Sequence, residues 1–243
     1  IYQKWIVQHK HIFENIGKYW TGVWDKYSIA ENQATPVLKK YKWFVAPSMS
    51  TDIIFYVMQL NKKQGRQDKA INKLFINYFS NNNWQNLEEM VESWNNCPIM
   101  RKRLKILKDC VQTLKKVPSQ SINISHIILP VLIAQIDGIL TDYLNSNNIP
   151  WQCNYDDFIQ QGQVRRVGRK SQFRINSPRV LTTQLDDIAK IVFLDILFQS
   201  SRQPVNTPFN FNRHKIMHGE SVKFGRKDYL IRAFMVLDFL AHL

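Results

Sequence analysis

The apolar residues of this chain recur at three- and four-residue steps along most of its length, and this spacing constrains the fold more than any other feature. A step of this size places apolar side chains on one face of an α-helix, whereas a half-buried strand would alternate them every second residue. Because 44% of the 243 residues are hydrophobic, the chain can also bury a substantial core. We therefore predict an all-α protein.

Individual helices can be placed from this spacing and from the residues that begin or end a helix. We expect helices over residues 53–60, 70–79, 99–116, 127–144 and, after Asp228 as the capping residue, 230–241. The asparagines at 81–83 should stop the second of these helices. Pro130 should lie in the first turn of the helix over 127–144. Residues beyond the first turn donate their backbone N–H within the helix, and proline has no N–H to donate.

The polar stretch that begins at Pro118 is the expected boundary between two regions. Residues 1–117 are predicted to form a helical N-terminal region that senses a signal or extends a dimer. Residues 118–243 hold four expected helices: 127–144, a helix that begins at Ser177 and Pro178, a short helix that contains His218, and 230–241. This is the natural content of a helical bundle.

The balance of charge indicates a polyanionic partner, because 33 Lys and Arg residues face only 19 Asp and Glu, for a net charge of +14. A segment without any acid between Asp157 and Asp186 carries the main cluster, and we expect it to bind RNA phosphates through Arg165, Arg166, Arg169, Lys170, Arg174 and Arg179. A second cluster comprises Arg101, Lys102, Arg103, Lys105 and Lys108. Such runs also occur on faces that are merely solvated, so this alternative stays open for both clusters.

Three cysteines without a CxxC pair indicate neither a disulfide framework nor a zinc knuckle, and they fit a reducing cytoplasm. The longest uninterrupted apolar run, 127–134, is too short to cross a bilayer. We therefore expect a cytoplasmic protein that neither binds a membrane nor requires a cofactor.

Arg213, His214 and His218 form the most suggestive chemical group, in a polar segment that follows Pro204 and Pro208. An arginine can hold a phosphate, and a histidine can transfer a proton near neutral pH. Taken alone the spacing is weak evidence, because a chain with 12 arginines and 6 histidines contains about 0.3 such pairs by chance.

Two other interpretations of the same residues remain open. His214 and His218 are four residues apart and could ligate a metal from one helix face, although no third ligand stands at a convincing spacing and no metal site is expected. Alternatively, Arg213 pairs with an acid such as Asp137, and the histidines only cap helices.

The residues around this group resemble a known family. The stretch 211–219, followed by 224–229 and an apolar helix that ends in 237–240, is similar to the signature of the HEPN superfamily, in which an arginine and a polar residue precede a histidine. Arg213 matches the arginine, His214 the polar position and His218 the histidine. Residues 124–140 also resemble the helix that precedes this motif, so the resemblance covers about residues 120–243.

The resemblance implies a HEPN-like four-helix bundle that cleaves RNA without a metal, by attack of the RNA's own 2′-hydroxyl to leave a 2′,3′-cyclic phosphate. Arg213 would hold the phosphate, His218 would transfer the proton and His214 would orient them, with Asp137, Gln135 and Asn212 in support. Members of this family act as toxins or phage-defence effectors and form homodimers with a shared active site. The expected partners are therefore RNA, including tRNA, a second copy of the chain, and an antitoxin or sensor protein. A catalytically silent module that binds RNA or a protein is the alternative.

Overall fold

The computed structural model describes residues 26, 28–61, 67–117, 122–146, 197 and 211–242, and every regular element within them is helical. A helix over residues 28–41 comes first. The elements that follow are α2 (Ile53–Asn61), α3 (Gln67–Ser93), the 3₁₀ turns η1 (Trp94–Asn96) and η2 (Pro98–Met100), α4 (Leu104–Lys116), α5 (Ser125–Ser146), α9 (Arg213–Met217) and α10 (Lys227–Ala241). The prediction of an all-α protein is confirmed, while the HEPN type of bundle stays a prediction.

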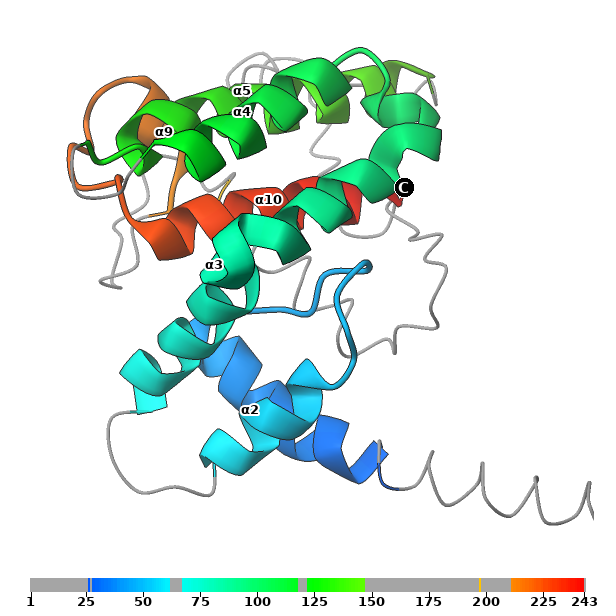
Figure 1. The fold of residues 1–243 in the computed structure, drawn as a ribbon, viewed down its shortest axis with the longest axis vertical. Coiled ribbons are helices and arrows are strands. Elements are labelled where there is room, and N and C mark those ends of the chain that lie inside the picture. The colour runs from blue at the N-terminus through cyan, green and yellow to red at the C-terminus, as the bar shows by residue number, and fades with distance from the viewer. Residues whose placement is uncertain are drawn as a thin grey trace, which may run out of the picture.

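The helices are arranged around α10, as Figure 1 shows. On one side α4, α5 and α9 form a layer, and α5 packs directly on α10. Helix α3 packs on both α10 and α4, and its first part leads down to α2 at the far end of the molecule. Because α3 contacts α2, α4 and α10, it connects the N-terminal helices to the layer that carries α9.

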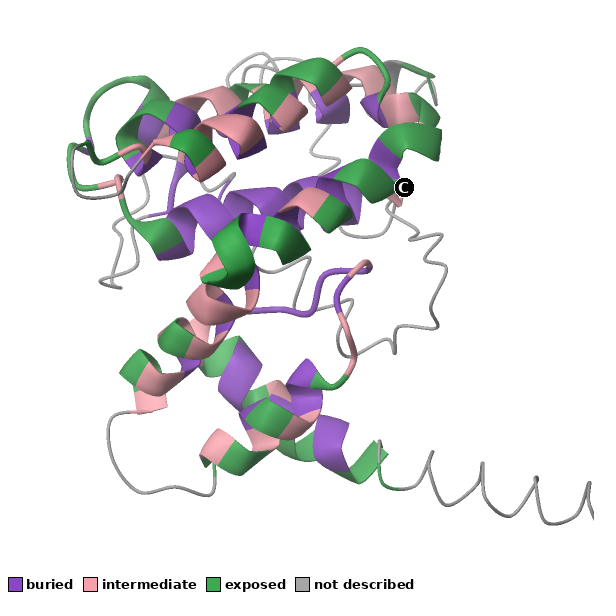
Figure 2. Cartoon of the chain, in the orientation of Figure 1, coloured by how far each residue is buried: buried purple, intermediate pink, exposed green. Residues whose placement is uncertain are grey.

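The last helix is buried on all sides, and every residue from Asp228 to Ala241 lies in the interior (Figure 2). The sequence predicts only one inward face for this helix, so that expectation is incomplete. The prediction that Asp228 caps the helix is wrong, because Arg226 occupies the N-cap position. The Asp228 carboxylate instead accepts hydrogen bonds from Arg226 Nε at 2.9 Å and from Arg232 Nη1 at 2.7 Å.

Polar side chains of α10 bind the N-terminal region directly. The Asp238 carboxylate accepts hydrogen bonds from the backbone N–H and the hydroxyl of Ser48, at 2.7 and 2.6 Å, and from Trp94 Nε1 at 2.7 Å. Arg232 donates to the carbonyl oxygen of Lys42 at 2.8 Å, and its guanidinium lies 3.6 Å from the centre of the Trp43 ring. The two regions predicted from the sequence therefore share one core, although Pro118 itself lies outside the described residues.

The interruption expected in α3 is confirmed. Backbone dihedrals from Asn81 to Trp84 are not helical, and Asn82, Asn83 and Trp84 have left-handed φ angles of 49°, 52° and 65°. Asparagine tolerates this conformation better than most residues, because its short polar side chain can bond locally. The break lets the first part of α3 pack with α2 while the second part follows α10.

Helix α5 provides the surface on which α9 sits, and it differs from its prediction at Pro130. The helix begins at Ser125, so Pro130 is its sixth residue and lies beyond the first turn. Among the described residues, Ser125–Tyr143 is the one stretch long and apolar enough to cross a membrane, and 44% of that window is buried inside the protein. Its buried residues, which include Leu132, Ile136 and Leu140, belong to the common core.

Candidate functional site

Local sequence determines where α9 begins. Asn212 has an extended backbone, with φ −120° and ψ 123°, and its side-chain oxygen accepts a hydrogen bond from the N–H of Lys215 at 3.1 Å. This N-cap satisfies one of the backbone donors that a helix leaves free at its start. Asn212 is buried, so its contribution to the site is to fix the first turn that carries Arg213 and His214.

Gly219 follows the end of α9 and turns the chain away from it. Its φ of +74° lies in the left-handed region, which glycine adopts without the steric cost that a Cβ brings. The N–H of Gly219 bonds to the Ile216 carbonyl at 3.3 Å, and the N–H of Ser221 folds back to the Lys215 carbonyl at 2.8 Å. These bonds place His218 at the exposed end of the helix.

Both ends of this segment are anchored in the core. Ile216, within α9, has a buried side chain. The ring of Phe211, just before α9, is also buried, and its centroid lies 5.4 Å from that of Tyr229 in α10. On the α5 side, Arg213 Nη1 lies 3.2 Å from Asp137 Oδ1. The motif is therefore held on a rigid base although α9 has only five residues.

His214 and His218 lie on the same face of the segment. Their rings are nearly parallel, with an interplanar angle of 11° and centroids 5.9 Å apart. This follows from their four-residue spacing, which places two side chains above one another on a helix. His218 is exposed and His214 is half-buried, so a ligand approaching from solvent reaches His218 first.

The surroundings of His214 disfavour its charged form and lower its pKa below the usual value of 6.5. Partial burial is the largest cause, followed by the positive charges of Arg213 and His218. Asp137 and Glu220 act in the opposite direction without reversing the shift. His214 is therefore predominantly neutral at pH 7 and can accept a proton.

The contact between Arg213 and Asp137 is an ion pair without the alignment of a hydrogen bond. Asp137 Oδ1 is buried and has no hydrogen-bond partner, even though the guanidinium nitrogen lies 3.2 Å away. The two side chains remain 24% and 34% exposed, so water screens part of their attraction. Such a pair helps to orient Arg213 above α5.

The sequence predicts Asp137 and Gln135 together as supporting residues, and the structure brings only Asp137 to α9. Residues two positions apart on a helix point in directions about 200° apart around its axis. The side chains of Gln135 and Asp137 therefore cannot both face α9. Gln135 is half-buried on another side of α5 and forms no hydrogen bond among the described residues.

Of the two basic clusters predicted from the sequence, the structure describes only the second. The RNA-binding residues predicted between 165 and 179 lie outside the described residues, so their role stays a prediction. In the second cluster, Arg103 donates to Asp142 at 2.6 Å and Lys108 to Glu92 at 2.8 Å, so part of its charge is offset. Arg101 and Lys105 are exposed without an ion pair among the described residues.

Gly138 has a role that sequence reasoning missed. The guanidinium of Arg103 crosses α5 at this position, where a Cβ would lie 2.6 Å from its Nη2 atom. Arg103 lies over this glycine where it donates to Asp142, and Gly138 directly follows Asp137, which pairs with Arg213. The only sequence signal was a glycine inside a helix, which often marks such a close approach.

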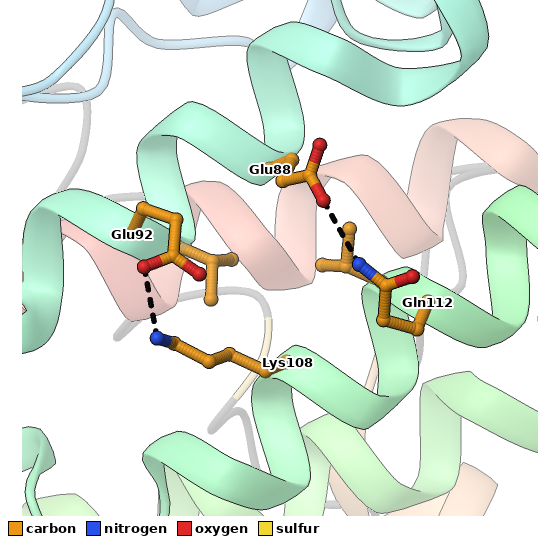
Figure 3. A pocket seen from close by; sticks show the side chains of 6 residues that line it. Glu88, Glu92, Lys108 and Gln112 are labelled. Atoms are coloured by element: carbon orange, nitrogen blue, oxygen red, sulfur yellow. Dashed lines mark hydrogen bonds and ion pairs between the residues drawn. The ribbon is translucent and has the colours of Figure 1, made fainter.

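A hollow between α3 and α4 offers no alternative site. Its volume of about 10 Å³ holds at most one water molecule, and it is lined by Glu88, Val91, Glu92, Lys108, Val111 and Gln112. Gln112 bonds to Glu88 at 2.9 Å and Lys108 to Glu92 at 2.8 Å across it, as Figure 3 shows. Nowhere in the described part of the chain do three or more His, Cys, Asp or Glu side chains gather as metal ligands.

Comparison of the chain with protein-family models, with curated proteins and with solved structures gives no match. Any functional conclusion therefore depends on the residues of the site. Those residues are a guanidinium, a neutral imidazole and a more exposed imidazole, held on one capped turn beside a carboxylate.

Proposed function

We propose that this protein is a metal-independent endoribonuclease with Arg213, His214 and His218 as its catalytic residues. The observation that carries the proposal is that α9 presents an arginine and two parallel imidazoles, of which His214 has a lowered pKa. An anion-binding group beside a group that can accept a proton at neutral pH meets the minimum requirement for RNA cleavage by transesterification.

The reaction would use the RNA itself as the nucleophile. As a base removes the proton of the 2′-hydroxyl, the 2′-oxygen bonds to phosphorus and the bond from phosphorus to the 5′-oxygen breaks. The leaving 5′-oxygen takes up a proton, so the products are a 2′,3′-cyclic phosphate and a 5′-hydroxyl. Arg213 would offset the negative charge that builds on the phosphate oxygens, which its permanently charged, planar group suits.

His218 is the proposed proton carrier because it is the more exposed of the two histidines. His214, lying parallel behind it and predominantly neutral, would orient it without adding a second charge beside Arg213. One histidine cannot serve as base and acid in the same step. We therefore propose a homodimer in which the His218 side chains of two subunits share these roles across a two-fold axis.

Substrate binding would depend on the positive charge of the chain. A net charge of +14 favours a polyanion, and the cluster from Arg165 to Arg179 is the proposed grip on the RNA backbone. A structured RNA such as a tRNA is the proposed substrate. Uncontrolled cleavage would harm its own cell, so we propose a cytoplasmic toxin or anti-phage effector that an antitoxin or sensor protein restrains.

A catalytically silent module that binds RNA or a partner protein is the second candidate. The observation that favours it is the ion pair between Arg213 and Asp137, which gives the arginine a structural partner. In that case His214 and His218 would have no proton to transfer, and their replacement would leave RNA binding intact.

Incubation of the purified protein with tRNA and other structured RNAs in EDTA distinguishes the two candidates. The nuclease should leave 2′,3′-cyclic phosphate ends, and Arg213→Ala or His218→Ala should slow cleavage by a factor of about 100 or more. Arg101→Ala removes an exposed arginine elsewhere and serves as the matched control. A folded wild-type dimer that cleaves no RNA supports the silent module, and cleavage that requires a divalent metal excludes the mechanism above.

A further inference from the structure

Two segments distant in the sequence lie side by side at the end of the molecule where α5 begins: residues 122–127 and residues 222–227 (Figure 1). Asn123 Nδ2 donates to the Gly225 carbonyl at 2.7 Å. The rings of His126 and Phe224 pack edge to face, with centroids 5.1 Å apart and an interplanar angle of 88°. A Cβ on Gly225 would overlap the His126 ring, so glycine is required for this approach. We call the combined face the 122/222 surface.

The 122/222 surface exposes aliphatic side chains together with cations. Ile122, Ile127 and Val222 are 52%, 55% and 75% exposed. Lys223 and Lys227 are exposed as well, and neither forms an ion pair within the described part of the chain. A single exposed isoleucine is ordinary, but a group of exposed aliphatic side chains indicates an interaction site.

The geometry of this surface is fixed by its own contacts. The carboxylate of Asp228 holds Arg226 at 2.9 and 3.0 Å, at the end of the loop that carries Val222. At the other end of that loop, the bond from Ser221 to Lys215 ties the surface to α9. A rigid surface loses little entropy when it binds a complementary shape, and this one lies beside the segment that carries His218.

The chemistry of the surface selects among the classes of partner. Single-stranded RNA would be held by aromatic rings that stack on bases, whereas the exposed large apolar side chains here are aliphatic. A second copy docked through the same surface would bring like charges together. Insertion into a lipid bilayer does not require side chains fixed relative to one another. A protein segment with both apolar and acidic side chains complements the aliphatic groups and the lysines at the same time.

We propose that the 122/222 surface binds an acidic segment of a partner protein. The apolar side chains of that segment would pack on Ile122, Ile127 and Val222, and its carboxylates would face Lys223 and Lys227. The binding does not depend on the proposed nuclease activity. If the chain is a nuclease, a partner bound here lies next to His218 and obstructs the approach of RNA.

The test uses the full chain and a displayed library of random 16-residue peptides. Selected peptides should combine Asp or Glu with Leu, Ile or Phe, and the double variant Val222→Ser/Lys223→Glu should weaken their binding at least 10-fold by fluorescence anisotropy. Lys105→Glu/Ile106→Ser is the matched control, because it removes one exposed aliphatic side chain and reverses one exposed lysine on α4. That control should retain wild-type affinity.

Other outcomes would overturn the proposal. Equal weakening by both double variants would show attraction to the overall positive charge rather than to this surface. Binding to phosphatidylglycerol vesicles, or self-association in analytical ultracentrifugation, would assign the surface to lipid or to a second copy if the Val222→Ser/Lys223→Glu variant abolished it. Selection of no peptides, or of peptides without acids, would also reject an acidic partner.

Discussion

Asp137 Oδ1 lies 3.2 Å from Arg213 Nη1, so the middle of α5 holds the first residue of α9. The same carboxylate raises the pKa of His214, whereas burial, Arg213 and His218 lower it. One acid therefore influences both the position of the arginine and the protonation of the histidine beside it.

Replacement of Asp137 by asparagine should lower the His214 pKa further, because it removes the negative charge that raises this pKa most while preserving the shape of the side chain. The effect on stability should stay below about 1 kcal/mol, since the ion pair is partly exposed. NMR titration of the imidazole resonances measures the shift. Asp142→Asn is the control, because Asp142 lies on α5 like Asp137 but pairs with Arg103 instead of Arg213. An unchanged or raised His214 pKa in Asp137→Asn would contradict this prediction.

His214 should make folding stability depend on pH in a definite direction. Its pKa is lowered in the folded protein, so below the unfolded value of about 6.5 the unfolded chain binds more protons than the native one. Stability is therefore full above this value and falls as the pH drops through it. His214→Gln should reduce the loss of melting temperature between pH 7.5 and pH 5.5. An equal loss in wild type and variant would show that other groups cause it.

The turn after the motif should depend on glycine for its backbone alone. Gly219 has φ +74°, and no atom lies within 4 Å of a Cβ built on it. Gly219→Ala should therefore cost about 1–2 kcal/mol in urea unfolding from the left-handed conformation, and Gly219→Asn should cost less. Equal stability of Gly219→Ala and wild type would mean that the turn can adopt another conformation.

The sequence predicts this local structure well because the signals lie within a few residues of one another. Asn212 before α9, Gly219 after it and the asparagines of α3 each act on their own backbone. The i, i+4 spacing of His214 and His218 likewise determines their parallel rings. Helix ends and the internal geometry of the motif could therefore be predicted without knowledge of the tertiary fold.

Long-range contacts explain what could not be predicted. The charged residues of α10 suggest a solvent-facing side, yet Arg232 bonds to the carbonyl of Lys42, which is 190 residues away. In the same way, Gly138 gives no sign in the sequence that Arg103 crosses it. Pairing over such distances depends on the packing of the whole chain, so helical spacing alone predicted α10 to be half-exposed.

Asp238 should be among the least replaceable residues of the fold. It is fully buried, and three donors from Ser48 and Trp94 converge on its carboxylate. Asp238→Ala removes the shared acceptor of these three donors from the interior, so the free energy of unfolding should fall by about 3 kcal/mol or more. Asp109→Ala removes an exposed acid from α4 and should change it by less than about 0.5 kcal/mol. Urea denaturation compares the two, and a loss under 1 kcal/mol for Asp238→Ala would contradict the expectation.

Residues 118–243 expressed alone should not form a stable tertiary structure, although the sequence predicts a boundary at Pro118. Without the N-terminal region, α10 would expose the side that packs on α3, and Asp238 would lose Ser48 and Trp94. Buried charges without partners are costly, so the fragment should show broad amide NMR signals and no cooperative thermal transition. Adding residues 1–117 in trans should restore a cooperative transition if the two parts need each other only for packing. A fragment of residues 118–243 that melts cooperatively by itself would establish that region as an independent domain.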